Sequence, residues 1–378
     1  MRSPTLKALG WSVAGWVAAC LLFILIRFVG LDTVPQFEGF DTARIHLSRL
    51  FVEGLLLGGV VGTLFHLLDR LLDQPAIRRR PYGAIILIQT AGNVGLMVVA
   101  QAAIIGIRWL LEPGLAGRES FTGRLWSTNA AVMLVYVTLV SSLFAFLKQV
   151  NRKFGPGNLW KLLIGMYHHP REEQRIFMFL DLKGSTTHAE RLGHAAFSRL
   201  IQDCFIDLSV VVDHAAQVYQ YVGDEVILYW EIDDGLDQAR CLRAYFQFVD
   251  RLASRGAHYQ GAYGVVPVFK AGLNMGPATV LEVGEIKREI SYLGDVLNTA
   301  ARIQGQCNEV GKDLLVPDNL LQRLEPLPDD LMAERVGEVA LRGRDEKVTI
   351  HAVHRRGNPN ARSESRGRRE DPPRGASI

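Results

Sequence analysis

This sequence has few cysteines and little net charge. Its four cysteines, Cys20, Cys204, Cys241 and Cys307, are scattered and form no C-x-x-C pair. We therefore expect buried or inert thiols of a reducing compartment rather than disulfides or a zinc site. The 42 basic and 39 acidic residues leave a formal net charge of +3. That balance is too small to indicate a polyanion partner, so no nucleic-acid binding is predicted.

The chain does contain long apolar runs, and they are concentrated in its first 150 residues. Hydrophobic residues make up 48% of the 378 residues. Four stretches approach or exceed the ~20 residues that span a bilayer: Leu9–Val29, Phe51–Leu72, Ile85–Leu111 and Ala130–Val150. The sequence therefore predicts a lipid-embedded α-helical bundle of four spans over residues 1–150.

Basic residues predict how these spans are oriented. They precede span one and follow spans two and four, whereas the other two loops mix both signs: Arg2 and Lys7, Arg78 to Arg80, and Lys148, Arg152 and Lys153. Lysine and arginine accumulate on the cytoplasmic side of a membrane. We therefore expect a multi-pass protein of the inner (plasma) membrane with both termini in the cytoplasm.

Three ionisable residues in or near the spans are candidates for a separate role. His46 lies near an outer loop and His66 near the inner end of span two, so the pair cannot share one haem or metal site. Glu53 lies inside span two, where a carboxylate is costly, or near enough to the outer surface to be solvated. The sequence identifies no upstream signal or partner for the spans.

Two segments of different composition flank the region that follows. In the predicted connector, residues 151–175, Gly155-Pro156-Gly157 ends the helix of span four. A short amphipathic segment, Leu159–Tyr167, and a charged run complete the connector. Residues 355–378 contain almost no apolar side chains and are rich in Arg, Gly, Pro and Ser, which predicts a disordered basic tail.

Between them, strands and helices alternate. The apolar run Ile176–Leu180 predicts a buried strand that ends at Asp181, before a Lys-Gly-Ser-Thr-Thr turn into a helix. The further expected elements are a helix over 187–214, a hairpin over 218–230, a helix over 234–254, and strands over 265–274 and 278–285. The order β-α-β-β-α-β predicts an α+β ferredoxin-like palm.

This topology brings two carboxylates together. The first strand and the hairpin are neighbours in such a sheet, so Asp181 and the hairpin residue Asp224 meet at one edge. Two adjacent carboxylates repel each other unless cations are present. The pair therefore favours divalent ions bound with a triphosphate. Taken alone, the stretch around Asp181 favours a simpler interpretation, an acid that ends a strand before a helix cap.

Four motifs carry a family resemblance. FLDLKGST, YQYVGDEV, KAGLNMGP and ISYLGDVLNTAAR occur in this order and resemble the class III nucleotidyl cyclases, the adenylate and guanylate cyclase catalytic domains. The resemblance implies a class III cyclase homology domain over residues 176–354 of a membrane-anchored bacterial type. It also implies an adenylate cyclase that converts ATP into 3′,5′-cyclic AMP and pyrophosphate by two-metal catalysis, as a step in signal transduction.

The resemblance implies roles for residues around the first strand. Asp181 and Asp224 would hold two Mg²⁺ or Mn²⁺ ions per site, with the Leu182 carbonyl as a further ligand. The β- and γ-phosphates would lie in a cradle of backbone amides from Lys183, Gly184, Ser185 and Thr186.

Other residues would complete the site from a later part of the chain. By the same resemblance, Asn298 would orient the ribose and Arg302 would stabilise the charge on the α-phosphate. Their spacing of four residues places them on one helix face. Arg342 and Arg344 stand in the segment where the family carries a phosphate-binding lysine. Because the family's site lies between two subunits, the resemblance implies a homodimer with two equivalent sites.

The residues expected to read the base depart from the family pattern. Gln220 stands where adenylate cyclases usually carry Lys and guanylate cyclases Glu, and Ser291 stands where the family has Asp or Thr. A glutamine amide can face adenine and, turned over, guanine. The lack of Glu favours ATP, with a guanylate cyclase as the alternative.

Two further alternatives stay open at this point. VGDEV resembles the hairpin of diguanylate cyclases, and the domain could instead serve a non-catalytic nucleotide-binding membrane receptor.

Overall fold

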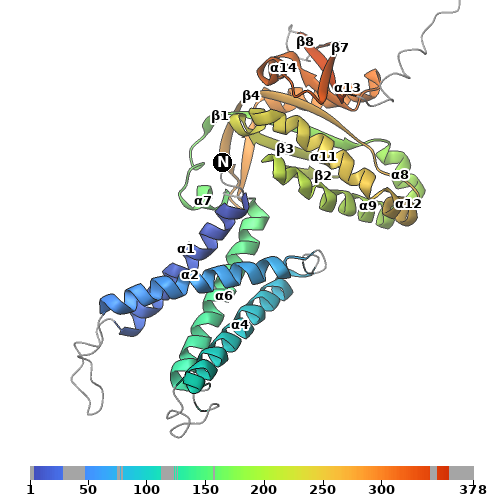
Figure 1. Cartoon of the computed structure of the whole chain (residues 1–378). Helices are drawn as coiled ribbons and strands as arrows, with labels where there is room; N and C mark the ends of the chain where they lie inside the picture. Colours follow the sequence, from blue (N-terminus) through green and yellow to red (C-terminus); the bar gives the residue numbers. More distant parts are fainter. Residues whose placement is uncertain are drawn as a thin grey trace, which may run out of the picture. The chain divides into compact units, whose positions relative to one another are not determined.

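The computed structural model describes residues 4–28, 47–74, 77, 80–111, 123, 125, 127–155, 158–340 and 347–356. The chain divides into two compact units, Met1–Phe154 and Gly155–Ile378 (Figure 1).

The first unit is helical. Its long helices among the described residues are α1 (Pro4–Phe28), α2 (Leu47–Leu72), α4 (Tyr82–Leu111) and α6 (Thr128–Phe154). Each contains a stretch long and apolar enough to cross a membrane: Ala8–Ile26, Phe51–Leu72, Tyr82–Ile107 and Ala130–Lys153. The predicted helical membrane bundle is confirmed, and the chain is a multi-pass membrane protein.

The helices of this bundle meet through aromatic packing and through close approach at glycines. The ring of Trp16 on α1 meets Phe65 on α2 and Phe144 on α6 edge-on, at centroid distances of 4.6 and 5.3 Å. A Cβ at Gly58 would lie 2.6 Å from the Cα of Val17. Glycine therefore lets the backbones of α1 and α2 touch, as small residues do between membrane helices.

The ionisable candidates of the spans occupy separate places. Glu53 is exposed and lines a hollow of about 520 Å³ whose other walls are mainly apolar. His66 is half-buried on α2. His46 lies outside the described residues, as do Arg2, Arg78 and Arg79.

The second unit is built on an eight-stranded sheet in the order β2-β3-β1-β4-β6-β8-β7, with β5 paired to β4. The strands are β1 (Arg171–Leu182), β2 (Gln217–Val222), β3 (Glu225–Glu231), β4 (Phe269–Val283), β5 (Glu289–Leu293), β6 (Leu314–Pro317), β7 (Leu331–Ala340) and β8 (Lys347–Arg355). Strands β2, β3, β1 and β4 are mutually antiparallel neighbours. This is the predicted ferredoxin-like core, which is confirmed.

The first helix of this unit precedes β1, and the other helices lie between strands. The helices are α7 (Asn158–Leu163), α8 (Ser185–Leu192), α9 (His194–Asp207), α10 (Ile232–Leu236), α11 (Arg240–Ser254), α12 (Gly256–Tyr263), α13 (Asp295–Val310) and α14 (Asp318–Leu324), with 3-10 turns η4 (Leu208–His214) and η5 (Asp237–Ala239). The single helix expected over 187–214 is wrong, because Gly193 at φ 73° separates α8 from α9. The helix expected over 234–254 is likewise broken, at Gln238 and Ala239, which both have positive φ.

The two strands expected over 265–274 and 278–285 are one continuous strand, β4. It pairs with β1 from Phe269 to Val280 without interruption. On its other side β4 pairs with β6 at residues 271–272 and with β5 from residue 279, so this edge is unpaired at Pro277. A proline is tolerated where no ladder partner needs its N–H. The first strand also begins earlier than expected, at Arg171 within the stretch assigned to the connector.

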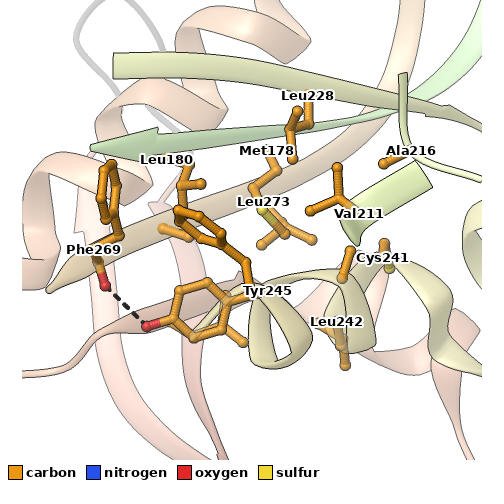
Figure 2. Packing of buried hydrophobic residues seen from close by; sticks show 14 of the residues in the cluster. Met178, Leu180, Val211, Ala216, Leu228, Cys241, Leu242, Tyr245, Phe269 and Leu273 are labelled. Atoms are coloured by element: carbon orange, nitrogen blue, oxygen red, sulfur yellow. Dashed lines mark hydrogen bonds between the residues drawn. The ribbon is translucent and has the colours of Figure 1, made fainter. Parts of the chain in front are cut away.

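Alternation along β1 assigns its side chains to two faces. Ile176, Met178 and Leu180 belong to the large core with α9 and α11, part of which is drawn in Figure 2. Phe177 and Phe179 belong to the opposite core, with residues of β5 and α13. Successive side chains in a strand point to opposite faces. Residue 181 therefore shares the face on which α13 lies.

Candidate active site

Carboxylates gather where β1 ends and β3 begins. Asp181 is paired with Glu225 across these strands, and Asp224 forms the turn just before Glu225. Burial raises the pKa of Asp181, the hydrogen bond from Lys270 opposes that rise, and the charge of the adjacent Asp224 raises the pKa further. The structure thus brings together the two aspartates that the sequence placed at this edge.

A third carboxylate, not expected from the sequence, joins them. Burial, followed by the charges of Asp181 and Asp224, raises the pKa of Glu225 to about 7. Glu225 is half-buried at the start of β3. The charge of this cluster therefore depends on which cations are near it.

One such cation is a lysine of the neighbouring strand β4. Lys270 is paired with Asp181 in the β1–β4 register, and its Nζ lies 3.2 Å from Asp181 Oδ2. The Nε2 of Gln304 on α13 donates to the same oxygen at 3.3 Å. The Lys270 side chain is only 9% exposed. Sequence reasoning missed both residues, although a lysine within the apolar run of β4 was a signal.

The backbone explains how α13 reaches this point. A Cβ on Gly272 would lie 2.2 Å from the Gln304 nitrogen and 2.5 Å from its Cα. The absent side chain lets α13 lie directly on β4. The amide of Asn274 fixes the start of the helix by donating to the carbonyl of Val296 at 3.1 Å.

The donor set suits a hard divalent cation. Mg²⁺ is commonly held by one or two carboxylates, with water and substrate phosphates as the other ligands. Asp181 and Asp224 provide that minimum, and Leu182 is the last residue of β1 beside them. In the described parts of the chain, no three His, Cys, Asp or Glu side chains are placed to hold a metal ion together, and this includes Asp181, Asp224 and Glu225. The Lys270 ammonium shows that Asp181 already accepts a cation. These residues therefore fit Mg²⁺ or Mn²⁺ with a phosphate-bearing substrate.

The turn after β1 offers an anion site. Gly184 adopts the left-handed conformation at φ 65° and begins α8, and no side chain caps this helix end. The first-turn amides, including those of Ser185 and Thr186, are therefore suited to an anion. The Lys183 amide is not available, since it donates to the Val268 carbonyl at 2.8 Å. Its ammonium forms an ion pair with Asp313.

The two residues expected to read the base lie on strands that contact each other in the folded domain. Gln220 is exposed on β2 and Ser291 is half-buried on β5. Their neighbours Tyr219 and Tyr292 stack edge-on with centroids 5.0 Å apart. The Tyr292 N–H also donates to the Tyr219 hydroxyl at 3.5 Å. This contact brings β5 over the sheet toward β2.

Asn298 and Arg302 lie on the far side of α13 from the carboxylates. At ~100° per residue, Gln304 is about 120° around the helix from Asn298 and about 160° from Arg302. Gln304 faces Asp181 of its own chain, so the other two face away from it. Asn298 is exposed and Arg302 half-buried. Arg342 and Arg344 lie outside the described residues.

The chain is similar in sequence to two known proteins. No protein-family model matches the chain. Adenylate cyclase 2 of Rhizobium meliloti (strain 1021) is 33% identical over 333 residues, which cover 82% of this chain and 90% of that protein. An adenylate cyclase of Anabaena cylindrica is 23% identical over 236 residues, 60% of this chain and 46% of that protein.

A solved structure shares the fold. The structure of a bacterial light-regulated adenylyl cyclase has a TM-score of 0.50 and 14% identity, covering 61% of this chain and 67% of that chain. At this identity the likeness concerns the fold alone.

Proposed function

This chain belongs to the adenylate cyclases, and from that premise we propose that it converts ATP into 3′,5′-cyclic AMP and pyrophosphate at the site around Asp181. The observation that carries the proposal is the pairing of Asp181 and Asp224 beside the uncapped start of α8. The 33% identity over 82% of the chain supports it.

In this proposal Asp181 and Asp224, with the Leu182 carbonyl, hold two divalent cations, Mg²⁺ or Mn²⁺. When bound, such cations lower the pKa of a hydroxyl and neutralise phosphate charge. Lys270 and Gln304 hold Asp181 by its Oδ2 atom. The carboxylate is therefore oriented before substrate arrives.

The remaining residues position the nucleotide. The first-turn amides of α8 bind the β- and γ-phosphates. The ribose 3′-oxygen attacks the α-phosphorus of the same molecule; the new O–P bond forms as the bond to the β-phosphate oxygen breaks. The hydroxyl proton passes to solvent and pyrophosphate leaves. Gln220 and Ser291 face the base, and the absence of a glutamate at position 220 favours adenine.

The site is completed by a second copy of the chain. Asn298 orients the ribose and Arg302 stabilises the α-phosphate of a nucleotide that is held by the aspartates of the other chain. This arrangement is supported by the helix face of Asn298 and Arg302, which points away from Asp181 of their own chain. Arg342 and Arg344 lie in the segment that would add phosphate contacts. The functional form is then a homodimer with two equivalent sites.

We assign residues 1–150 to the membrane domain, 151–175 to the connector, 176–354 to the catalytic domain and 355–378 to a basic tail; the last five connector residues already belong to β1. The protein resides in the inner membrane with both termini in the cytoplasm, where ATP is found. Basic residues at the ends of the second and fourth long helices support this orientation: Arg70 on α2 and Arg152 and Lys153 on α6.

The test uses the purified full chain in detergent or nanodiscs with Mn²⁺ and either ATP or GTP. Cyclic AMP from ATP, absent in the Asp181→Ala variant, is the expected product. Cyclic GMP from GTP would identify a guanylate cyclase, since the Gln220 amide can turn over. Cyclic di-GMP would identify a diguanylate cyclase. Nucleotide binding without any cyclic product would identify a receptor.

A further inference from the structure

A lysine of the phosphate turn is paired with an acid from the other side of β4. Lys183 follows β1, and its N–H donates to the Val268 carbonyl at 2.8 Å. Asp313 precedes β6, and its carbonyl accepts from the Ala271 N–H at 2.6 Å. Because β4 lies between β1 and β6 in the sheet, the Lys183–Asp313 ion pair crosses the first residues of β4.

Both backbones are fixed by the sheet, whereas the side chains remain partly exposed. The exposed fraction is 35% for Lys183 and 47% for Asp313. Water and salt screen an ion pair with this exposure, so it is weakly held. A polyphosphate carries several negative charges against the single charge of Asp313. Lys183 can therefore change partner without any movement of the strands.

Lys183 lies where a change of partner from Asp313 to phosphate would affect nucleotide binding. Gly184 and the uncapped first turn of α8 follow Lys183 directly in the sequence. The lysine side chain is therefore attached beside the amides suited to phosphate, while its ammonium is held across β4 by Asp313. Two other lysines at this end of the sheet already have acidic partners: Lys270 is held by Asp181 and Lys312 by Glu334. Asp313 stands outside that carboxylate cluster and pairs with Lys183 instead.

We propose that Asp313 is a positioning residue that holds the Lys183 ammonium beside the phosphate turn, and that Lys183 moves from Asp313 to the β- or γ-phosphate of a bound nucleotide. The inference rests on the proposed function, because it concerns the ligand of the same site. Asp313 then competes with every polyphosphate for the lysine. It weakens the binding of ATP and of pyrophosphate and favours the release of product.

The test is pyrophosphate binding, measured by titration calorimetry on the full chain in detergent at a fixed Mg²⁺ concentration. Asp313→Asn should bind pyrophosphate about two- to fivefold more tightly, the range for an exposed ion pair. Lys183→Met should bind about tenfold more weakly, because a charge-assisted contact is lost. The double variant should match Lys183→Met, since Asp313 acts only through the lysine.

Two controls keep the result interpretable. Asp313→Glu keeps the ion pair and should retain the wild-type affinity. Glu334→Gln breaks a comparable pair, Lys312 with Glu334 at 3.1 Å, and should leave pyrophosphate affinity unchanged. Melting curves of each variant report whether it is folded.

The outcomes separate this inference from the proposed function. If Asp313→Asn binds pyrophosphate no more tightly than wild type, the inference is wrong while the cyclase assignment stands. It is also wrong if Asp313→Asn tightens binding equally in the Lys183→Met background, because direct repulsion then explains the effect. A wild-type chain that binds neither pyrophosphate nor ATP and forms no cyclic nucleotide overturns both.

Discussion

The ammonium of Lys270 lies 3.2 Å from the Oδ2 atom of Asp181, on the strand next to it. Burial and the charge of Asp224 raise the pKa of Asp181. Burial and the charges of Asp181 and Asp224 likewise raise the pKa of Glu225. Lys270 therefore offsets part of the repulsion in a group of three carboxylates. Lys270 therefore stabilises the folded protein when no divalent cation is bound.

The first prediction concerns this lysine. Lys270→Met should destabilise the protein in EDTA by about 1–3 kcal/mol, the usual cost of leaving a buried polar group without its partner. Excess Mn²⁺ should raise the melting temperature of the variant more than that of the wild type, because a divalent ion replaces the lost charge. Differential scanning fluorimetry with EDTA and with Mn²⁺ measures both effects.

Lys287→Met is the matched control for that experiment. Lys287 also pairs with an acid, Glu289 at 2.9 Å, but its side chain is 83% exposed. An exposed pair contributes little, so the control should melt like the wild type under both conditions. An equal Mn²⁺ response in Lys270→Met and wild type would contradict the role given to Lys270.

The second prediction tests how α13 is seated. A methyl group at position 272 would collide with the backbone of Gln304 at 2.2 Å. Gly272→Ala should therefore push α13 away from β4, at a cost of about 1–3 kcal/mol or more, and cyclase activity should fall with it. Chemical unfolding and turnover of the same preparation provide the measurement.

Gly305→Ala, on the same helix, should behave in the opposite way. A Cβ at Gly305 meets nothing within 4 Å, and alanine is the better helix former by about 0.5–1 kcal/mol. This variant should be as active as the wild type and slightly more stable. Similar losses in both variants would mean that the close approach at Gly272 is unimportant.

The sequence predicted those parts of the site that depend on local pattern. The run Ile176–Leu180 predicted a buried strand, and a carboxylate at its end can be recognised without knowledge of the rest of the fold. The hairpin with Asp224 at its tip is equally local. The ferredoxin-like order of elements then placed the two aspartates together, because it fixes which strands are neighbours.

The contacts around those aspartates depend on register and could not be predicted in this way. Lys270 is opposite Asp181 because of the register in which β4 pairs with β1, and the sequence pattern predicts no register. Gln304 reaches Asp181 only because Gly272 lets α13 lie on the sheet. Asp313 meets Lys183 across β4. A shift of one residue in either strand would turn these side chains to the other face.

The third prediction concerns pH. The pKa of Glu225 is raised from 4.5 to about 7 in the folded protein. The folded state therefore binds this proton more tightly than the unfolded state. The resulting stability is fully present below pH 4.5 and is lost as the pH rises through about 7. Relative to Glu225→Gln, the metal-free wild type should lose free energy of unfolding across this interval.

Denaturant unfolding in EDTA at several pH values measures this difference. Glu285→Gln is a suitable control because Glu285 is exposed; its pH profile should follow that of the wild type. Parallel profiles for Glu225→Gln and wild type between pH 4.5 and 7 would contradict the raised pKa of Glu225.

The last prediction tests whether two chains share each site. In the proposed homodimer, Asp181 of one chain acts with Arg302 of the other, so Asp181→Ala and Arg302→Ala should each be inactive alone. In a mixed dimer one site combines both losses and the other has neither. Random pairing of equal amounts makes half of the dimers mixed, each with one intact site of two. Co-expression should therefore restore about one quarter of wild-type turnover per chain.

Differently tagged chains make this measurable, because tandem purification isolates the mixed dimers, which should reach about half of the wild-type turnover. A double variant carrying both substitutions, co-expressed with itself, should remain inactive. Isolated mixed dimers that bind ATP yet form no cyclic AMP would mean that Asp181 and Arg302 act within one chain. Gln304 would then have to give up its contact with Asp181, because Gln304 and Arg302 lie on opposite sides of α13 and cannot both face the same site.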